Sequence, residues 1–411
     1  MSPTSTPTSV SPSGMTGTEI RASTSLASIF ALRMLGLFLI LPVFSVHAKT
    51  LPGGDSVFLV GLAMGIYGLT QSFGQIPFGI ASDKYGRKRV IIIGLILFAV
   101  GAFIAAAATD LLWVTIGRAV QGVGAISAAV TAFIADATRE EHRTKAMAMV
   151  GGSIGLTFAG SLVAAPFLYQ HIGMSGIFAL TGVLAIIGIL VVVYIVPAAP
   201  PLPAKKVPFT DILKNGELMR LNFGVFTLHL VQMAMFVIVP PALVHYADLP
   251  LAEHWKIYLP VVLVSFVLML PPVFVGEKYG KMKQVFVAAI GLLLAVQIGL
   301  WVALSQANVH PAALVLLLLA FFTAFNILEA SQPSLVSRIA PPDSKGAALG
   351  VYNTLQALGL FFGGALGGLM KQRVGESSIF ILGAGLVVVW LIIAVNMKNL
   401  PRRSQHQAAV V

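Results

Sequence analysis

The chain has 411 residues, of which 57% are hydrophobic and only 10% are charged, and its net charge is +11. A soluble protein of this length would carry far more charge on its surface, so this composition excludes a soluble multidomain protein. The basic excess does not form one patch but falls between long apolar runs, which argues against nucleic-acid binding. Cysteine is absent, which excludes disulfides, thiol catalysis and cysteine-based metal sites.

Twelve apolar runs follow one another along the chain, and a helix of about 20 apolar residues crosses the hydrocarbon core of a bilayer. The first 24 residues are rich in Ser, Thr and Pro and are expected to form a disordered cytoplasmic tail rather than a signal peptide. We therefore predict an all-α integral membrane protein with twelve transmembrane helices. The runs are 25–47, 56–82, 89–108, 111–136, 145–169, 175–196, 218–246, 256–276, 284–305, 311–338, 345–370 and 377–397.

The basic residues between these runs are divided unequally between the two sides of the membrane. Of the 26 Lys and Arg residues, 20 lie at the termini or in the even-numbered gaps, and four lie in the odd-numbered gaps. Cytoplasmic loops carry the excess of Lys and Arg, so this split places both termini in the cytoplasm. An even number of spans also requires the two termini to share one side.

The Pro-rich stretch 196–209 divides the chain into two halves of six runs each. The sequence "DKYGRK" at 83–88 reappears as "EKYGKM" at 277–282, an offset of 194 residues. We predict an N-terminal bundle over 25–196, a cytoplasmic linker over 197–217, a C-terminal bundle over 218–398 and a cytoplasmic tail over 399–411. The four-residue spacings Gly61/Gly65 and Gly364/Gly368 predict close helix packing. Paired bundles of this kind are typical of secondary transporters.

Two motifs connect the chain to a known family. The stretch "GIASDKYGRK" (79–88) matches Gly-x-Leu-(Ala/Ser)-Asp-(Arg/Lys)-x-Gly-(Arg/Lys)-(Arg/Lys) except at Ala81, and "RAVQGVGA" (118–125) matches Arg-x-x-Gln-Gly-x-Gly-Ala. Both resemble the major facilitator superfamily, over about residues 25–398. The strings "LNFG" (221–224) and "EHWKIYL" (253–259) resemble its YajR-type, drug-antiporter-like members. That type often carries a soluble domain after the last helix, and this chain is expected to lack it.

The charged loop between the second and third runs is interpreted as a cytoplasmic gate. Aspartate contributes little to orientation, and four-residue spacing puts Asp83 and Arg87 on one helical face. The resemblance implies that Asp83 faces the start of the eleventh helix, around Ser344–Ala348, and that Arg87 pairs with Asp136. Such a latch would hold the outward-open state. The charge of Lys88 is also explained by membrane topology alone, because cytoplasmic loops carry an excess of Lys and Arg. The predicted gate residues are Gly79, Asp83, Gly86, Arg87, Lys88 and Asp136.

Three charged residues fall inside spans, where an ionised group costs about 2.5–3.5 kcal/mol on insertion scales. They are Arg33, Arg118 and Glu329, in the first, fourth and tenth runs. The resemblance implies that these runs and the seventh line a central cavity. Glu329 is the leading candidate for proton carrier, followed by His229, and Arg118 is a further candidate for proton coupling. The predicted substrate-cavity residues are Arg33, Gln71, Gln121, Gln232 and Asn326.

Each of these side chains also has a simpler explanation. Glu329 would keep its charge if it paired with an arginine such as Arg33. His229 would then be a hydrogen-bonded packing residue, and Arg118 a structural residue bonded to Gln121. The antiporter pattern Gly-x8-Gly-x3-Gly-Pro of the fifth helix is only partly matched. Before Pro166 the chain has Gly152, Ser161 and Ala165.

We predict a secondary active transporter of the bacterial inner membrane that works by alternating access, with proton-coupled efflux of a small molecule. A proton-coupled metabolite or anion transporter, by symport or uniport, is the alternative that two cavity arginines favour. A non-transporting sensor would gain nothing from costly buried charges. The sequence has neither a P-loop nor an HExxH motif, so no enzyme, cofactor or metal is expected. The predicted partners are the bilayer, a small-molecule substrate and protons, without nucleic acid, and the chain is expected to act as a monomer.

Overall fold

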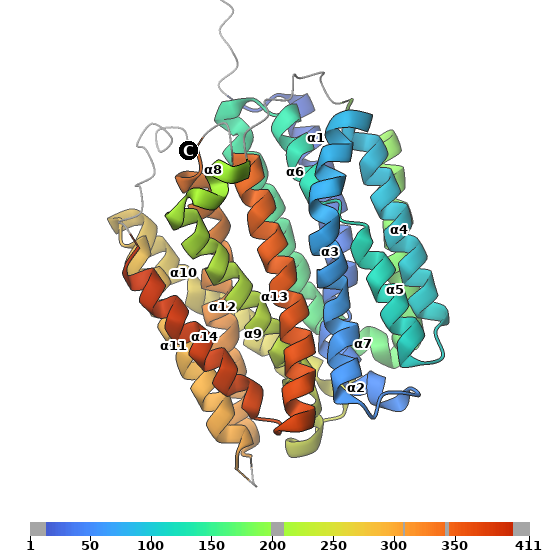
Figure 1. The fold of residues 1–411 in the computed structure, drawn as a ribbon, viewed down its shortest axis with the longest axis vertical. Helices are drawn as coiled ribbons and strands as arrows, with labels where there is room; N and C mark the ends of the chain where they lie inside the picture. Colours follow the sequence, from blue (N-terminus) through green and yellow to red (C-terminus); the bar gives the residue numbers. More distant parts are fainter. Residues whose placement is uncertain (1–13, 199–208, 307–308, 342–344, 398–411) are drawn as a thin grey trace, which may run out of the picture.

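The computed structural model describes residues 14–198, 209–306, 309–341 and 345–397. Within these ranges the regular structure is helical, and the helices form two bundles that stand side by side (Figure 1). One bundle contains α1 to α7 and the other α8 to α14. We call the end of the molecule at which α1 begins and α14 ends the terminal side, and the opposite end the distal side.

The N-terminal bundle contains the first six spans. The first span consists of α1 (Gly17–Phe38), α2 (Leu41–His47) and a 3-10 turn, η1 (Ala48–Thr50). The next two are α3 (Val57–Tyr85) and α4 (Arg87–Ala107). The fourth is broken into α5 (Leu111–Val123) and α6 (Ser127–Ala137), and α7 (Glu140–Tyr194) contains the fifth and sixth.

The C-terminal bundle begins with the short α8 (Phe209–Lys214) and contains six more spans. These are α9 (Gly216–Tyr246), α10 (Trp255–Tyr279) after the 3-10 turn η2 (Leu251–Glu253), α11 (Met282–Leu304), α12 (Pro311–Ile339), α13 (Lys345–Arg373) and α14 (Ser378–Val395).

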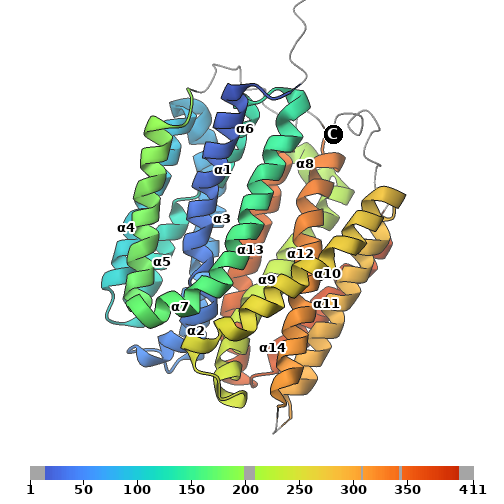
Figure 2. The same ribbon diagram turned by 180° about the vertical axis from the view of Figure 1, so that it is seen from behind.

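Eleven helical segments in the described parts of the chain are long and apolar enough to cross a membrane. One of them, Lys145–Tyr194, is too long for a single crossing, because 50 helical residues extend about 75 Å. Gly173 interrupts it with a φ of 65°, and the chain reverses direction there (Figure 2). This segment therefore supplies two crossings, and the twelve predicted spans are confirmed.

The first helix begins earlier than the sequence indicated. Residues 17–24 belong to α1, although the sequence assigned them to a disordered tail. A capping box explains the early start, because Thr16 and Glu19 satisfy each other's backbone N–H groups. The Glu19 carboxylate also binds Arg139, which immediately precedes α7, at 3.0 Å. The remaining predicted tail, 1–13, the stretch 199–208 of the linker and the tail 399–411 lie outside the described residues.

The internal repeat is visible in the way each bundle ends its sixth span. The last carbonyls of a helix lack partners within the helix and attract cationic side chains. In each half, one cation from the first span and one from the start of the third span bind these carbonyls. Ile195 and Val196 accept from Arg21 and Lys88, and Asn396 and Met397 accept from Arg220 and Lys283. The two halves therefore repeat a specific set of contacts.

The two bundles meet closely on the distal side. A Cβ atom added to Gly61 in α3 would overlap the carbonyl oxygen of Gly364 in α13, so only glycine permits this approach. Gly350 lies on the same face of α13 nearer the terminal side, and a Cβ added there would meet nothing within 4 Å. The two helices accordingly spread apart toward the terminal side (Figure 1).

Candidate transport site

The predicted gate residues gather where α3 turns into α4. Gly86 makes the turn with a φ of 95°, which L-amino-acid side chains rarely adopt. Arg87 begins α4 and forms an ion pair with Asp83, while its Nε lies 2.8 Å from Asp136 Oδ2. Its Nη1 also donates to Ser82 Oγ at 2.6 Å. Arg87 therefore holds together the ends of α3, α4 and α6.

The expected partner of Asp83 in the other bundle stays a prediction. The start of the eleventh helix, around Ser344–Ala348, lies partly outside the described residues. The Asp83 side chain is 47% exposed, so it is accessible to such a partner. Gly79 packs against α6: a Cβ atom added to Gly79 would lie 3.6 Å from the Cβ atom of Ala128. In the second copy of the motif, Glu277 contacts Arg338 at 3.3 Å.

A second cluster occupies the middle of the C-terminal bundle, where His229 of α9 and Glu329 of α12 face each other. His229 Nε2 lies 3.6 Å from Glu329 Oε2 and 2.7 Å from Nε2 of Gln356 in α13. Nδ1 lies 3.0 Å from the carbonyl oxygen of Val225. A neutral imidazole fits this geometry, with Nδ1–H donating to the carbonyl and Nε2 accepting from the Gln356 amide. Arg33, which the sequence offered as a possible partner of Glu329 in the simpler explanation, lies instead in the N-terminal bundle, beside Tyr67 and Ser127.

The remaining C-terminal candidates differ in position. Gln232 lies one turn from His229 on α9 and is 1% exposed, and its Oε1 has no hydrogen-bond partner. Asn326 of α12 donates to Ser265 Oγ of α10 at 3.0 Å. Asn326 is therefore engaged inside its own bundle.

A third cluster lies in the N-terminal bundle around the ring of Tyr67. The guanidinium carbons of Arg118 and Arg33 lie 4.8 and 5.6 Å from the ring centroid, within the range of cation–π contacts. Both arginines are 1% exposed. Arg118 Nη1 donates to Gln121 Oε1 at 3.0 Å, and Arg33 Nη1 donates to Ser127 Oγ at 3.1 Å. Gln71, one turn along α3 from Tyr67, is 5% exposed.

Residues 26–364 match a family model described as "Major Facilitator Superfamily", and a second match covers 261–409. The chain belongs to the Major Facilitator Superfamily. It is 42% identical over 393 residues to the inner membrane transport protein YajR of Escherichia coli (strain K12), covering 94% of this chain and 85% of that protein. It is 25% identical over 342 residues to the multidrug resistance protein MdtH of Aeromonas hydrophila, covering 81% of this chain and 82% of MdtH.

A solved structure has the same fold. The human organic anion transporter MFSD10 (TETRAN) superposes with a TM-score of 0.68 at 18% sequence identity, over 92% of this chain and 100% of that chain. This likeness shows the fold alone. As a member of the Major Facilitator Superfamily, the chain is a multi-pass membrane transporter and not an enzyme, as the sequence predicted.

Two contributors to these clusters, and one aromatic residue between the bundles, were missed in the sequence. Gln356 is a polar residue in a largely apolar and Gly-rich run that also contains Asn353 and Thr354, and a polar residue in a span points to a buried partner. Tyr67 gives no such signal, because aromatic residues are common in spans. Phe158 of α7 is equally inconspicuous, yet its ring contacts Phe236, Phe322 and Phe325 of the opposite bundle, with centroids 5.3–6.4 Å apart.

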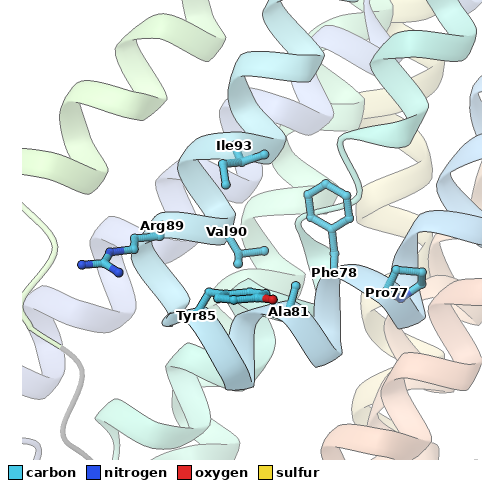
Figure 3. Close-up of a pocket in the computed structure, with 7 residues that line it drawn as sticks. All are labelled: Pro77, Phe78, Ala81, Tyr85, Arg89, Val90 and Ile93. Carbon is cyan, nitrogen blue, oxygen red and sulfur yellow. The ribbon is translucent and has the colours of Figure 1, made fainter.

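A cavity of about 480 Å³ lies beside the gate, between the end of α3 and the start of α4 (Figure 3). Its lining is apolar apart from Arg89, which points away from the hollow, and from the hydroxyl of Tyr85. Tyr85 and Ile93 are 58% and 52% exposed. The hollow therefore opens on the outer surface of this superfamily member and is separate from the three polar clusters.

Proposed function

We propose that this chain is a proton-coupled secondary transporter that exports a small molecule by antiport across the bacterial inner membrane. The observation that carries the proposal is the contact between His229 and Glu329 in the middle of the C-terminal bundle. Glu329 is the only carboxylate in the middle of a described span, and its Oε2 has no hydrogen-bond partner. A carboxylate that has a histidine neighbour but no hydrogen-bond donor in this setting is expected to take up a proton as part of the transport cycle.

The distribution of basic residues indicates which end of the molecule faces the cytoplasm. The terminal side carries the Lys and Arg excess, so we assign it to the cytoplasm. The bundles are in contact on the distal side and spread on the terminal side, which corresponds to a conformation that faces the cytoplasm. In the outward-facing conformation, Asp83 would reach the start of α13 and close the cytoplasmic side.

Infrared spectroscopy of the purified protein tests the proton site without a known substrate. We expect a carbonyl band of a protonated carboxylic acid that changes with pH and that Glu329→Gln removes. Glu253→Gln is the matched control, because Glu253 is an exposed glutamate paired with Lys256. A band that survives in Glu329→Gln would place the titrating carboxyl elsewhere.

Liposomes that contain a pH-sensitive dye test coupling. With ethidium and benzoate tested separately as probe substrates, we expect at least one of the two to drive proton movement by the native protein and by Glu253→Gln, and neither to drive it in Glu329→Gln. Equal proton movement in Glu329→Gln would refute the assignment of this residue.

A proton-coupled metabolite or anion transporter is the second candidate. The observation that favours it is the pair Arg33 and Arg118, which are fully buried and have no acidic partner among the contacts described. A cationic substrate would be repelled by these two charges, whereas an anion would compensate them. The liposome measurements above separate the two candidates, because ethidium and benzoate carry opposite charges.

A further inference from the structure

The fourth span is broken near the middle of the membrane. α5 ends at Val123 and α6 begins at Ser127, so residues 124–126 are not helical. Glycines let neighbouring helices come close to this break: a Cβ added to Gly122 would overlap the Tyr67 carbonyl, and one added to Gly124 would overlap the Gly94 carbonyl. A broken helix inside a membrane exposes polar backbone groups that need partners. In transporters such breaks occur where the backbone meets substrate or ions.

The beginning of α6 is an unusual N-terminus. It belongs to a helix of 11 residues, and Ile126 at the N-cap supplies no side-chain hydrogen bond. The N–H of Ala128 donates to Gln75 Oε1 at 3.2 Å. The N-terminus carries about half a positive charge from the helix dipole and attracts anions. Instead of an anion, the cationic Arg33 lies here, bonded to Ser127.

The second observation is independent of the helix terminus: both arginines have unused hydrogen-bond donors. Nε and Nη2 of Arg33, Nε and Nη2 of Arg118 and the Tyr67 hydroxyl are buried without a hydrogen-bond partner. An unpaired buried guanidinium costs several kcal/mol, so such an arrangement needs a compensating group. Arg118 lies in the last two turns of α5, where the negative end of the helix dipole compensates part of its charge. The side chain of Arg33 lies at the start of α6, where the positive end of the helix dipole adds to its charge.

The carboxylates of this bundle cannot supply the missing charge. The carboxylates whose side chains are described all lie near the ends of spans. They are Glu19 at the start of α1, Asp55 in the loop before α3, Asp83 at the end of α3, Asp110 at the start of α5 and Asp136 at the end of α6. Among the described side chains, the middle of the N-terminal bundle therefore combines two cations and a helix N-terminus with no anion.

We propose that Arg33, Arg118, Tyr67 and the N-terminus of α6 form a subsite for the carboxylate group of a small organic anion. The unused guanidinium N–H groups would donate to the carboxylate oxygens, a geometry to which arginine is well suited. The Tyr67 hydroxyl would donate a further hydrogen bond. This inference rests on the proposed transport function and names the substrate class. Bound anion would compensate the buried charges and thereby favour the conformation in which the site is closed.

Thermal unfolding and calorimetry of the full-length protein in lipid nanodiscs test the subsite. The probes are benzoate, its cationic counterpart benzylamine, and chloride, at constant ionic strength. We expect saturable stabilisation by benzoate and none by benzylamine. Arg33→Gln and Arg118→Gln should each weaken benzoate binding about tenfold or more, because a charge-assisted contact is lost. Arg89→Gln is the matched control, since Arg89 is an exposed arginine of the same bundle.

Further variants keep the test decisive. Should the Gln variants fail to fold, Arg118→Lys and Tyr67→Phe retain charge or ring and should still weaken benzoate binding severalfold. Glu329→Gln should bind benzoate like the native protein, so loss of proton coupling and loss of anion binding are distinguishable. Benzoate binding that is unchanged in all arginine and tyrosine variants would overturn the proposal. Chloride that stabilises the native protein as strongly as benzoate, and through the same arginines, would overturn the assignment to carboxylates.

Discussion

The two ring nitrogens of His229, in the C-terminal bundle, form hydrogen bonds with two different neighbours. His229 gives its Nδ1–H to the Val225 carbonyl, and its Nε2 accepts from Gln356. A proton that arrived on Nε2 would face the Gln356 amide donor, so this amide must turn before an ion pair with Glu329 can form. We infer that Glu329 takes up the proton and that His229 stays neutral as long as the Gln356 amide donates to its Nε2.

The charge of Asp83 provides a prediction at the same scale. In Asp83→Asn, Arg87 keeps Asp136 and Ser82 as partners, so the fold and the membrane insertion should be retained. The contact of a carboxylate with the start of α13 would be lost, and such contacts contribute about 0.3–2 kcal/mol. A loss of that size changes an equilibrium by a factor of about 2–30, and transport in liposomes should slow accordingly.

The neighbouring residue Lys84 is the control for this variant. It is exposed and lies at the same end of α3, so Lys84→Gln should transport like the native protein. Native transport rates in Asp83→Asn, at equal protein levels, would remove the latch from the mechanism. A variant that no longer folds would show instead that Asp83 mainly supports Arg87.

Among the helices, α3 and α13 carry the contact between the bundles on the distal side. Beyond the glycine contacts, Gln372 at the end of α13 reaches into the opposite bundle. Its Oε1 accepts from the N–H of Phe58 at 2.9 Å and from Ser56 Oγ at 3.2 Å. Ser56 is the N-cap of α3. One bundle thus caps a helix of the other, and the cap must be released when the distal side opens.

Gln372→Ala should therefore favour the conformation that opens on the distal side. It removes two hydrogen bonds, each with a net contribution of about 0.5–1.5 kcal/mol, so the population ratio should shift about fivefold or more. Because the chain contains no cysteine, spin labels can be placed on a single introduced pair at the distal ends of α3 and α13. Distance distributions by pulsed electron spin resonance measure the shift. Gln170→Ala, an exposed glutamine of α7, should leave the distribution unchanged.

The elements show which features a sequence can predict. The twelve spans follow from apolar length, and the contact of Arg87 with Asp136 follows from the family motif. The break at residues 124–126 could not be predicted, because glycine is common in membrane helices whether or not they are broken. The start of α1 was missed because the capping box at Thr16 and Glu19 lies in a stretch of disorder-prone composition.

Partners inside the bundles were harder to predict than the polar residues themselves. Glu329 and His229 stand out in apolar runs, but which residue each one contacts depends on helix rotation. The simpler explanation of Glu329 named Arg33 as a possible partner, whereas the structure places Arg33 beside Tyr67 and Ser127. Polar residues in spans are therefore visible in the sequence, and their pairing requires the fold.

In the molecule as a whole, the two bundles are sealed against each other by aromatic rings near the centre. Phe158 of the N-terminal bundle is 5% exposed and contacts Phe38 of its own half. Its ring also meets Phe236, Phe322 and Phe325 across the interface. Alternating access requires that such contacts break when the distal side opens. Phe158 is thus placed to separate the polar clusters from the distal side.

Phe158→Ala should open this seal. Each aromatic pair contributes about 0.5–1.5 kcal/mol beyond burial, and three pairs across the interface would be lost, so the shift toward the distal-open conformation should exceed that of Gln372→Ala. A cysteine introduced in place of Gln232 measures access to the centre of the molecule. A charged thiol reagent added from the distal side can reach this cysteine only when the aromatic contacts of Phe158 are broken. Labelling should be faster in Phe158→Ala than in Phe167→Ala, which removes a 54% exposed ring on the same helix. Equal labelling rates in the two variants would show that the seal lies elsewhere, in the close packing of α3 against α13.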